Sequence, residues 1–193
     1  MIKKIFACLL CAALTGSGFS FSPEKTSSAT NPQLEVDLSV EKGEMLNGGA
    51  GFLYGMSEPN VPDINTIIPL KPYATVQKAP DGLQHPNGDA LKVSDYFLEA
   101  GGEQIQIYVQ DIYENWPYEF TGIPDYLNKV ETIVKKVVEH PNKDTFVYVP
   151  FNEPDHIWYG GMSTQTQQRF FSDWKTVVEK IKSLHPNARI AGP

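Results

Sequence analysis

The sequence predicts an α/β fold in which β-strands alternate with α-helices along most of the chain. Two observations carry this prediction. Apolar residues recur at helical spacing in residues 126–138 and again in residues 170–184. A short hydrophobic run precedes each of these helices, at residues 105–111 and 145–151. Strands that alternate with helices indicate a parallel sheet with helical crossovers.

Residues 1–22 have the layout of a secretory signal peptide. Lys3 and Lys4 precede an apolar run that is too short to span a membrane, and small residues follow it. Both cysteines, Cys8 and Cys11, lie in this segment, so the exported chain is expected to lack disulfides and thiolate metal sites. We expect a secreted or periplasmic protein. An uncleaved anchor and a lipidated cysteine are the alternatives.

The composition is that of a globular protein, with 41% hydrophobic and 20% charged residues. A length of 193 residues is sufficient for one domain with a hydrophobic core. The formal net charge is −7, and the sequence contains no cluster of Lys and Arg. An acidic chain of this kind argues against nucleic acid as a partner and suits a neutral ligand.

Residues 23–44 are predicted to form a flexible leader that ends in a possible edge strand. Ser, Thr and Pro are frequent at its start, whereas residues 34–40 alternate strictly between apolar and polar side chains. The glycine-rich run of residues 48–55 predicts the first buried strand. Residues 67–76 could hold a second strand, although two prolines interrupt it.

The next elements are a helix and a strand. Asn-Gly-Asp at residues 87–89 begins a helix that extends to about Ala100, where Gly101 and Gly102 end it. Residues 105–111 then predict the third strand.

The last two strands flank one long helix. Residues 145–151 form the fourth strand, and a helix begins near Ser163, where Thr164 and Gln167 have the spacing of a capping box. A fifth strand begins at residue 188. The helices before the last two strands end at His-Pro-Asn triplets, in which proline prevents helix continuation, so these histidines are assigned a structural role.

About five strands and three clear helices are therefore predicted. A closed (β/α)₈ TIM barrel needs eight of each and typically about 250 residues. Residues 45–193 are thus predicted to be the N-terminal part of a TIM barrel that is truncated after about the fifth strand. Because half a barrel has open strand edges, the isolated chain is expected to be poorly stable or self-associating.

The sequence Phe-Asn-Glu-Pro-Asp follows the fourth predicted strand, at residues 151–155. In barrels, reactive groups lie at the carboxyl ends of the strands. Cleavage of a glycosidic bond usually needs two carboxyl groups, one of which donates a proton to the leaving oxygen. Glu153 is therefore a candidate proton donor, and Asn152 could bind a sugar hydroxyl. An ordinary loop or helix-cap glutamate is the alternative for Glu153.

Other candidate substrate-binding residues lie near the ends of the strands. Aromatic loop residues can stack on a sugar ring, but core or loop packing explains them equally well. The polar residues could hydrogen-bond a substrate, although Asp111 could equally be a helix N-cap or loop anchor. These candidates are His85, Gln110, Asp111, Trp116, Tyr118, Trp158 and Tyr159. No metal-ligand spacing, phosphate-binding glycine loop or Ser/His/Asp arrangement is present, so neither metal nor cofactor is expected.

Residues 149–155, followed by Trp-Tyr-Gly at residues 158–160, resemble the acid/base region of retaining glycoside hydrolases of clan A. Residues 170–193 are most similar to family 39, which includes β-xylosidases and α-L-iduronidases. The resemblance covers roughly residues 48–193 and is strongest from residue 145 onward.

This resemblance implies a TIM barrel and a carbohydrate substrate. It also implies that Glu153 is the general acid/base and that Asn152 is the partner of the sugar 2-hydroxyl. Clan A enzymes place the nucleophilic glutamate on the seventh strand, which this sequence does not reach. The chain alone is therefore expected to be inactive. The alternative is a secreted carbohydrate-binding or vestigial half-barrel without catalytic activity.

Overall fold

The computed structural model describes residues 34–44, 49–85, 87–161 and 163–192. The chain divides into two compact units, Met1–Gly43 and Glu44–Pro193. The predicted signal peptide lies outside the described residues.

The first unit contains no strand within its described residues. Residues 34–43 are exposed, so the edge strand predicted at residues 34–40 is wrong. The side chain of Asp37 accepts hydrogen bonds from the backbone N–H of Ser39, at 2.9 Å, and from its hydroxyl, at 2.6 Å. Such a turn competes with extended structure, and a strand gains its stability only from a partner strand.

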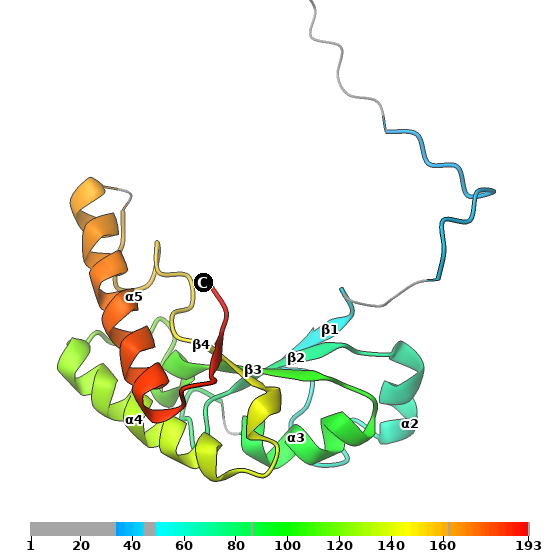
Figure 1. Cartoon of the computed structure of the whole chain (residues 1–193), viewed down its shortest axis with the longest axis horizontal. Helices are drawn as coiled ribbons and strands as arrows, with labels where there is room; N and C mark the ends of the chain where they lie inside the picture. The colour runs from blue at the N-terminus through cyan, green and yellow to red at the C-terminus, as the bar shows by residue number, and fades with distance from the viewer. Residues whose placement is uncertain (1–33, 45–48, 86, 162, 193) are drawn as a thin grey trace, which may run out of the picture. The chain divides into compact units, whose positions relative to one another are not determined.

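The second unit contains a five-stranded sheet in the order β1-β2-β3-β4-β5 (Figure 1). Every neighbouring pair is parallel. The strands are β1 (Gly51–Leu53), β2 (Ala74–Lys78), β3 (Gln104–Tyr108), β4 (Phe146–Val149) and β5 (Arg189–Ile190). This confirms the predicted α/β class, and the sequential parallel order is compatible with part of a (β/α) barrel.

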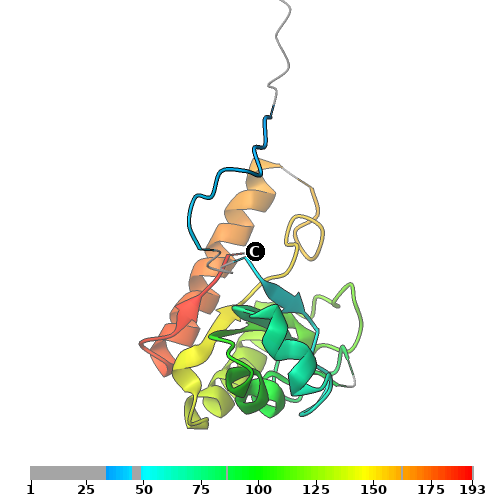
Figure 2. The same ribbon diagram turned by 90° about the vertical axis from the view of Figure 1, so that its right-hand side faces the viewer.

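Helices connect successive strands. They are α2 (Ile64–Ile67), α3 (Ala90–Glu99), α4 (Ile123–Glu139) and α5 (Thr164–Leu184). Three 3₁₀ turns accompany them: η1 (Ile68–Leu70), η2 (Val109–Ile112) and η3 (Lys143–Thr145). Figures 1 and 2 show α3 and α4 on the same side of the sheet, and α5 packs against α4.

The two faces of the sheet differ in burial. On one face Ile105 and Ile107 of β3 are fully buried against the helices. The alternate residues of β3, Gln104, Gln106 and Tyr108, point to the other face and are only half-buried. The helices therefore cover one face of this sheet, as they do in a barrel.

The first two strands differ from their predictions. Strand β1 has three residues and lies at the edge of the sheet. Leu53 in this strand is 63% exposed, so the prediction of a buried strand is wrong for the described residues of that segment. The second strand begins later than predicted, because residues 64–70 are helical. Pro69 occupies the first turn of η1, where its missing N–H costs no hydrogen bond.

The helix boundaries agree well with the sequence signals. The side chain of Asp89, the last residue of the Asn-Gly-Asp triplet that was expected to open α3, caps this helix by accepting hydrogen bonds from the N–H groups of Leu91 and Lys92. Ser163 caps α5 by accepting a hydrogen bond from the N–H of Thr166 at 3.2 Å, so the cap lies one residue before the predicted Thr164. His140 and His185 are the C-cap residues of α4 and α5, which confirms their structural position.

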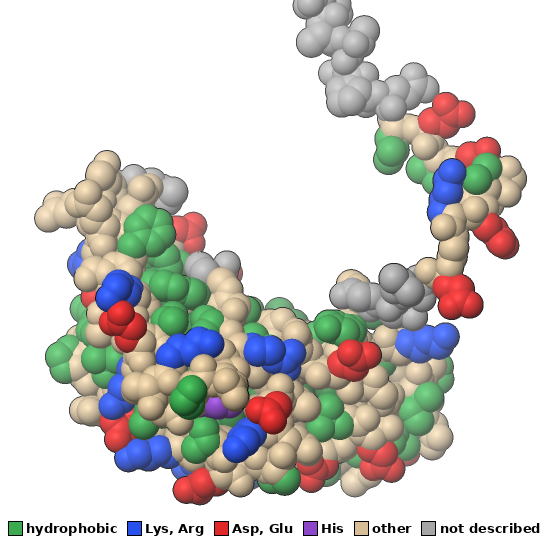
Figure 3. Space-filling model, in the orientation of Figure 1, with side chains coloured by type: hydrophobic (Ala, Val, Ile, Leu, Met, Phe, Trp, Pro, Cys, Tyr) green, Lys and Arg blue, Asp and Glu red, His purple; other side chains and the backbone are tan. Residues whose placement is uncertain are grey.

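Basic and acidic side chains are interspersed on the face of the second unit that Figure 3 shows. In the portion of the chain that the structure describes, no helix is long and apolar enough to cross a membrane.

Candidate functional site

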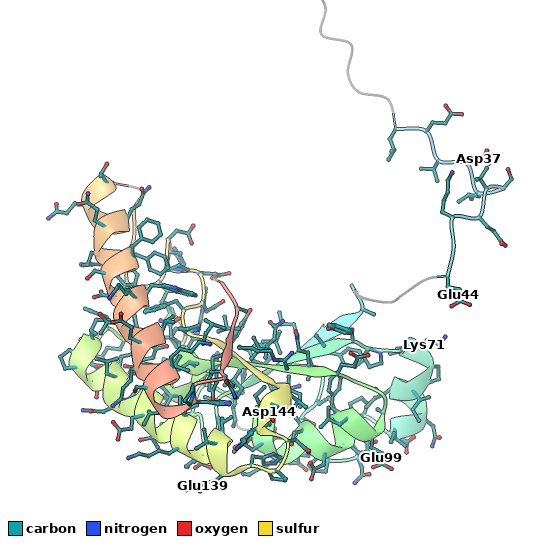
Figure 4. All side chains as sticks on the ribbon, in the orientation of Figure 1. Asp37, Glu44, Lys71, Glu99, Glu139 and Asp144 are labelled. Atoms are coloured by element: carbon teal, nitrogen blue, oxygen red, sulfur yellow. The ribbon has the colours of Figure 1, made fainter. Side chains whose placement is uncertain are left out.

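The loops that follow strands β1 to β4 enclose a pocket of about 260 Å³. Its lining residues are Leu53, Tyr54, Gln84, His85, Tyr108, Trp116, Tyr118, Asn152 and Glu153. In a parallel sheet these loops share one edge. Lys71, Glu99 and Asp144, which Figure 4 labels, lie in the segments that precede β2, β3 and β4. These preceding segments belong to the opposite edge of the sheet. Among the described lining residues, Glu153 is the one carboxylic acid.

Glu153 begins the turn that leads from β4 towards α5. Its side chain is exposed, and its backbone has a left-handed φ of 46°. The Glu153 carbonyl accepts hydrogen bonds from the N–H groups of His156, at 2.9 Å, and Ile157, at 2.7 Å. A left-handed conformation costs a residue with a side chain about 1 kcal/mol or more, and such strain is frequent at functional sites.

Gln110 lies beneath this turn rather than in the pocket lining. It is 1% exposed, and its side-chain oxygen accepts a hydrogen bond from the backbone N–H of Asn152 at 2.6 Å. The amide of Gln110 therefore fixes the residue that precedes Glu153. This contact connects the end of β3 to the end of β4.

Asp111 connects three loops around the pocket. Its side chain is fully buried and accepts hydrogen bonds from the hydroxyl of Tyr54, at 2.7 Å, and from the hydroxyl of Tyr118. Its backbone carbonyl accepts from the N–H groups of Leu83, at 3.0 Å, and Gln84, at 3.2 Å. The loops after β1, β2 and β3 thus converge on one residue.

Burial is the main cause of the pKa shifts of Asp111 and of the two tyrosines that bind it, Tyr54 and Tyr118. Desolvation raises the pKa of Asp111, although the hydrogen bonds from Tyr118 and Tyr54 oppose that rise. Burial, together with the charge of Asp111, also raises the pKa of both tyrosines, so both hydroxyls remain donors at neutral pH.

Two aromatic side chains line the pocket beside Tyr54. The ring of His85 contacts that of Tyr54 edge-on, with centroids 4.6 Å apart, and the ring of Tyr108 lies 5.8 Å away. Tyr108 is half-buried, and its pKa is raised first by burial and then by the charges of Asp111 and Glu153. The charge of Glu153 therefore acts on the hydroxyl of Tyr108.

The four predicted loop aromatics occupy different places, and Tyr118 lines the pocket. Trp116 lines the pocket and is 49% exposed, so its ring is accessible to a ligand. Trp158 instead donates its indole N–H to the carbonyl of Tyr118 at 2.9 Å. Its ring packs edge-on against that of Tyr126, with ring centroids 5.0 Å apart. Tyr159 is 2% exposed, and its hydroxyl donates to Asp173 of α5 at 2.9 Å.

A second pocket, of about 320 Å³, lies between the end of this loop and the start of α5. Its lining is mainly apolar: Pro154, Asp155, Tyr159, Gly161, Thr166, Gln167, Phe170 and Phe171. Of the candidates predicted from the sequence, the structure thus gathers Asn152, Glu153, His85, Trp116 and Tyr118 in the first pocket.

Sequence reasoning missed Leu53, Tyr54, Gln84 and Tyr108 as lining residues. Tyr54 and Tyr108 stand at or just after the ends of β1 and β3, so a closer reading of strand ends could have found them. No sequence signal marks Gln84, because its position depends on the contact between its loop and Asp111.

Within residues 34–44, 49–85, 87–161 and 163–192, no group of three or more His, Cys, Asp or Glu side chains is placed to hold a metal ion.

No family model matches this chain. It is 28% identical to the 3-O-beta-L-arabinopyranosyl-alpha-L-arabinofuranosidase of Bifidobacterium pseudocatenulatum, in a match that covers 96% of this chain and 24% of that protein. It is also 28% identical to the 3-O-alpha-D-galactosyl-alpha-L-arabinofuranosidase of Bifidobacterium longum subsp. longum, over 83% of this chain and 19% of that protein. The chain therefore spans about a quarter or less of the length of these curated relatives.

The solved structure of N2152 from Neocallimastix frontalis is similar to this chain with a TM-score of 0.63 and 26% identity. That similarity covers 75% of this chain and 36% of the other. Both curated relatives are arabinofuranosidases, and the match to them covers most of this chain. The chain is therefore related in sequence to glycoside hydrolases.

Proposed function

We propose that this chain forms the N-terminal (β/α) part of a retaining glycoside hydrolase of clan A, with family 39 as the family it most resembles. The supporting observation is the position of Glu153, an exposed carboxylic acid after β4 in a pocket with polar and aromatic walls. The sequence relationship to two glycoside hydrolases supports the same reaction class. We further propose that the protein is exported through residues 1–22.

The proposed substrate is a carbohydrate with an α-L-arabinofuranosyl residue whose O3 carries a second sugar. Both curated relatives have names that state this arrangement, although they differ in the outer sugar. The pocket supports the choice of a carbohydrate, because the exposed ring of Trp116 can stack on a sugar face. Asn152 would bind the 2-hydroxyl.

In the proposed mechanism Glu153 acts twice. In the first step a nucleophilic carboxylate attacks the anomeric carbon, and Glu153 donates its proton to the leaving oxygen as the glycosidic bond breaks. In the second step Glu153 takes a proton from water, whose oxygen displaces the carboxylate and releases the free sugar. Retention requires the two carboxyl groups to be about 5–5.5 Å apart. By resemblance, the nucleophile would belong to a seventh strand.

A carbohydrate-binding module without catalysis is the second candidate. One observation favours it: among the described residues that line the pocket, Glu153 is the one carboxylic acid. Such a module would bind the same sugars but would not hydrolyse them.

Sugar binding and hydrolysis should be measured separately on the full chain. Intrinsic tryptophan fluorescence reports binding of methyl α-L-arabinofuranoside, because Trp116 lies in the pocket; Trp116→Phe identifies its share of the signal. We expect saturable binding in the wild type and in Glu153→Gln. The absence of binding in the wild type would overturn the proposed substrate class.

Hydrolysis of 4-nitrophenyl α-L-arabinofuranoside is the second measurement. We expect none from the chain alone, because the proposed nucleophile is not among its residues. Turnover that Glu153→Gln abolishes would show that the chain supplies its own second carboxyl group. The DNA that follows the codon for Pro193 separates the two candidates, because the enzyme requires a seventh strand that ends in glutamate.

A further inference from the structure

We propose that Tyr108 is a specificity-determining residue, whose hydroxyl forms a hydrogen bond with a hydroxyl group of the sugar on which Glu153 acts. This inference rests on the proposed function of the pocket, and it adds a substrate contact that neither the motif at residues 152–153 nor the relatives supply. Tyr108 is the last residue of β3 and lines the pocket together with Glu153.

The direction of the Tyr108 side chain follows from its place in the sheet. Successive side chains of a strand point to opposite faces, and Ile107 is fully buried on the face that the helices cover. Tyr108 therefore points to the face that the helices leave open, at the edge of the sheet that carries the pocket. Its ring meets that of Tyr54 edge-on, with centroids 5.8 Å apart, and this contact supports its orientation.

The hydroxyl of Tyr108 is available to a ligand. Within the described part of the chain, no residue forms a hydrogen bond with it. It also keeps contact with solvent, because the one side-chain oxygen or nitrogen that is both fully buried and unpaired in that part of the chain belongs to Gln84. A phenolic hydroxyl both donates and accepts, so it can pair with a sugar hydroxyl in either direction.

Among the described residues that line the pocket, three are tyrosines, and they differ in what holds the hydroxyl. The hydroxyls of Tyr54 and Tyr118 both donate to the buried carboxyl group of Asp111. These two donors are occupied before a ligand arrives, so the two side chains form a fixed wall. The hydroxyl of Tyr108 can instead bind a ligand without breaking a hydrogen bond within the described protein.

The position of Glu153 relates this hydroxyl to the proposed reaction. Both side chains line the same pocket. The negative charge of Glu153 also contributes to the raised pKa of Tyr108, after burial and the charge of Asp111. Because such an effect weakens with distance, the hydroxyl and the carboxyl group face the same space. A sugar whose glycosidic oxygen receives the proton of Glu153 therefore comes within reach of Tyr108.

This arrangement discriminates between sugars by their hydroxyl groups. A bound sugar displaces water from the half-buried side chain of Tyr108. If the sugar presents a hydroxyl group there, a new hydrogen bond replaces those to water. An analogue without that hydroxyl leaves Tyr108 dehydrated and unpaired, which weakens binding.

The first test needs no ligand and makes the same change at two tyrosines of the pocket. We expect Tyr108→Phe to keep the melting temperature of the full chain within about 2 °C of the wild type, because no hydrogen bond within the protein is lost. Tyr54→Phe should lower it by about 4 °C or more, because Asp111 loses a donor. A comparable loss in Tyr108→Phe would show that the protein already pairs this hydroxyl and would overturn the inference.

The second test locates the hydroxyl by NMR in a chain with ¹³C at the Cζ atoms of its tyrosines. The resonance that is missing from Tyr108→Phe belongs to Tyr108. Saturation with methyl α-L-arabinofuranoside should shift this resonance, and Glu153→Gln should lower the pKa of Tyr108, because a nearby negative charge disfavours the phenolate. An unshifted resonance in the saturated chain, or an unchanged pKa in Glu153→Gln, would overturn the inference.

The third test measures the hydrogen bond itself. Calorimetric titration with methyl α-L-arabinofuranoside should show about tenfold weaker binding to Tyr108→Phe than to the wild type, which is the loss of roughly one hydrogen bond. One of the 2-, 3- and 5-deoxy analogues should bind the wild type about tenfold more weakly as well. That analogue and the parent sugar should bind Tyr108→Phe equally.

The outcomes separate this inference from the proposed function. Unchanged affinity of Tyr108→Phe for the parent sugar overturns the role of Tyr108 and leaves the sugar-binding pocket standing. Equal losses for the deoxy analogue in the wild type and in Tyr108→Phe also overturn it. The absence of binding to the wild type overturns the proposed substrate and this inference together.

Discussion

The ends of strands β3 and β4 both carry an amide followed by a carboxylic acid, yet the structure uses them differently. At the end of β3, Gln110 and Asp111 are buried and hydrogen-bonded to neighbouring loops. At the end of β4, Asn152 is half-buried, and Glu153 is exposed in the pocket. The same residue types at equivalent strand ends thus form a scaffold in one case and a candidate reactive group in the other.

The difference teaches that position at a strand end is not sufficient to assign a substrate contact. Burial and prior hydrogen bonding decide which carboxyl group is available. Both oxygens of Asp111 already accept hydrogen bonds from tyrosines, whereas Glu153 has solvent around its side chain. Asp111 is therefore a positioning residue, which holds Tyr54 and Tyr118 at the wall of the pocket.

The largest expected effect comes from truncating the two acids in parallel. Asp111→Ala should lower the free energy of unfolding by about 3 kcal/mol, because two buried tyrosine hydroxyls lose their acceptor. Glu153→Ala should change it by no more than about 0.5 kcal/mol, since the side chain is exposed. Urea denaturation followed by circular dichroism measures both. Equal losses of stability in the two variants would contradict the assignment of Asp111 to the scaffold and of Glu153 to the candidate reactive group.

The amide of Gln110 offers a second way to examine the scaffold. Gln110→Leu should cost about 1–3 kcal/mol, because it leaves the backbone N–H of Asn152 without its acceptor. Hydrogen exchange at the Asn152 amide, followed by NMR, should become faster in this variant. Gln106→Leu, a change to a half-buried strand residue, is the control. If the exchange rate at Asn152 is the same in both variants, Gln110 does not position that residue.

The left-handed backbone at Glu153 predicts a smaller change, which raises the free energy of unfolding where the preceding substitutions lower it. Glu153→Gly should raise the free energy of unfolding by about 0.5–1 kcal/mol, because glycine adopts a φ of 46° without steric cost. Asp155→Gly is the control and should lower stability, since that exposed residue does not have a positive φ. A loss of stability in both variants would mean that the turn stores no strain.

The raised pKa of Asp111 predicts a pH dependence. Because burial raises the folded-state pKa above the unfolded value of about 3.9, its contribution to stability is fully present below that pH. The contribution is lost as pH rises through the folded-state pKa. The wild type should therefore be most stable relative to Asp111→Asn in acid and lose that advantage towards pH 7. Urea titrations across this range measure the difference, and an advantage that grows with pH would contradict the sign.

The smallest expected effect lies on the outer surface, away from both strand ends. Glu131 of α4 pairs with Lys135 and with Lys180 of α5, and these hydrogen bonds lower its pKa to about 2. A lowered pKa gives stability that is present above the ordinary value and is lost as pH falls towards 2. Glu131→Gln should therefore be slightly less stable near pH 7 and equal to the wild type near pH 2. High salt should reduce the difference, because surface pairs are screened.

Local sequence signals predicted most of the second unit. Helical periodicity located α4 and α5, and the Asn-Gly-Asp and Gly-Gly signals at its two ends located α3, because these features depend on neighbours within a few residues. The alternation at residues 34–40 predicted a strand that does not form, because alternation says nothing about whether a partner strand exists. The edge position of β1 likewise depends on the rest of the sheet.

The candidate site was only partly predictable for the same reason. Strand order placed Asn152 and Glu153 at the pocket, and His85 and Trp116 line it as well. The partners of Gln110 and Asp111 lie 42 and 57 residues away in sequence, at Asn152 and Tyr54, so no local pattern reveals them. Gln84 lies at the pocket because its backbone N–H donates to the carbonyl of Asp111, and its residue type does not encode this contact.

The convergence of three loops on Asp111 has an evolutionary consequence. Substitutions at Tyr54, Tyr118 and the Leu83–Gln84 segment share one partner, so their energetic effects would not be additive. A change in the shape of the pocket that required one of these loops to shift would disturb the other two. Specificity in this pocket would therefore diversify by coordinated replacement of loops, or at Trp116, whose exposed ring can change without loss of the shared partner.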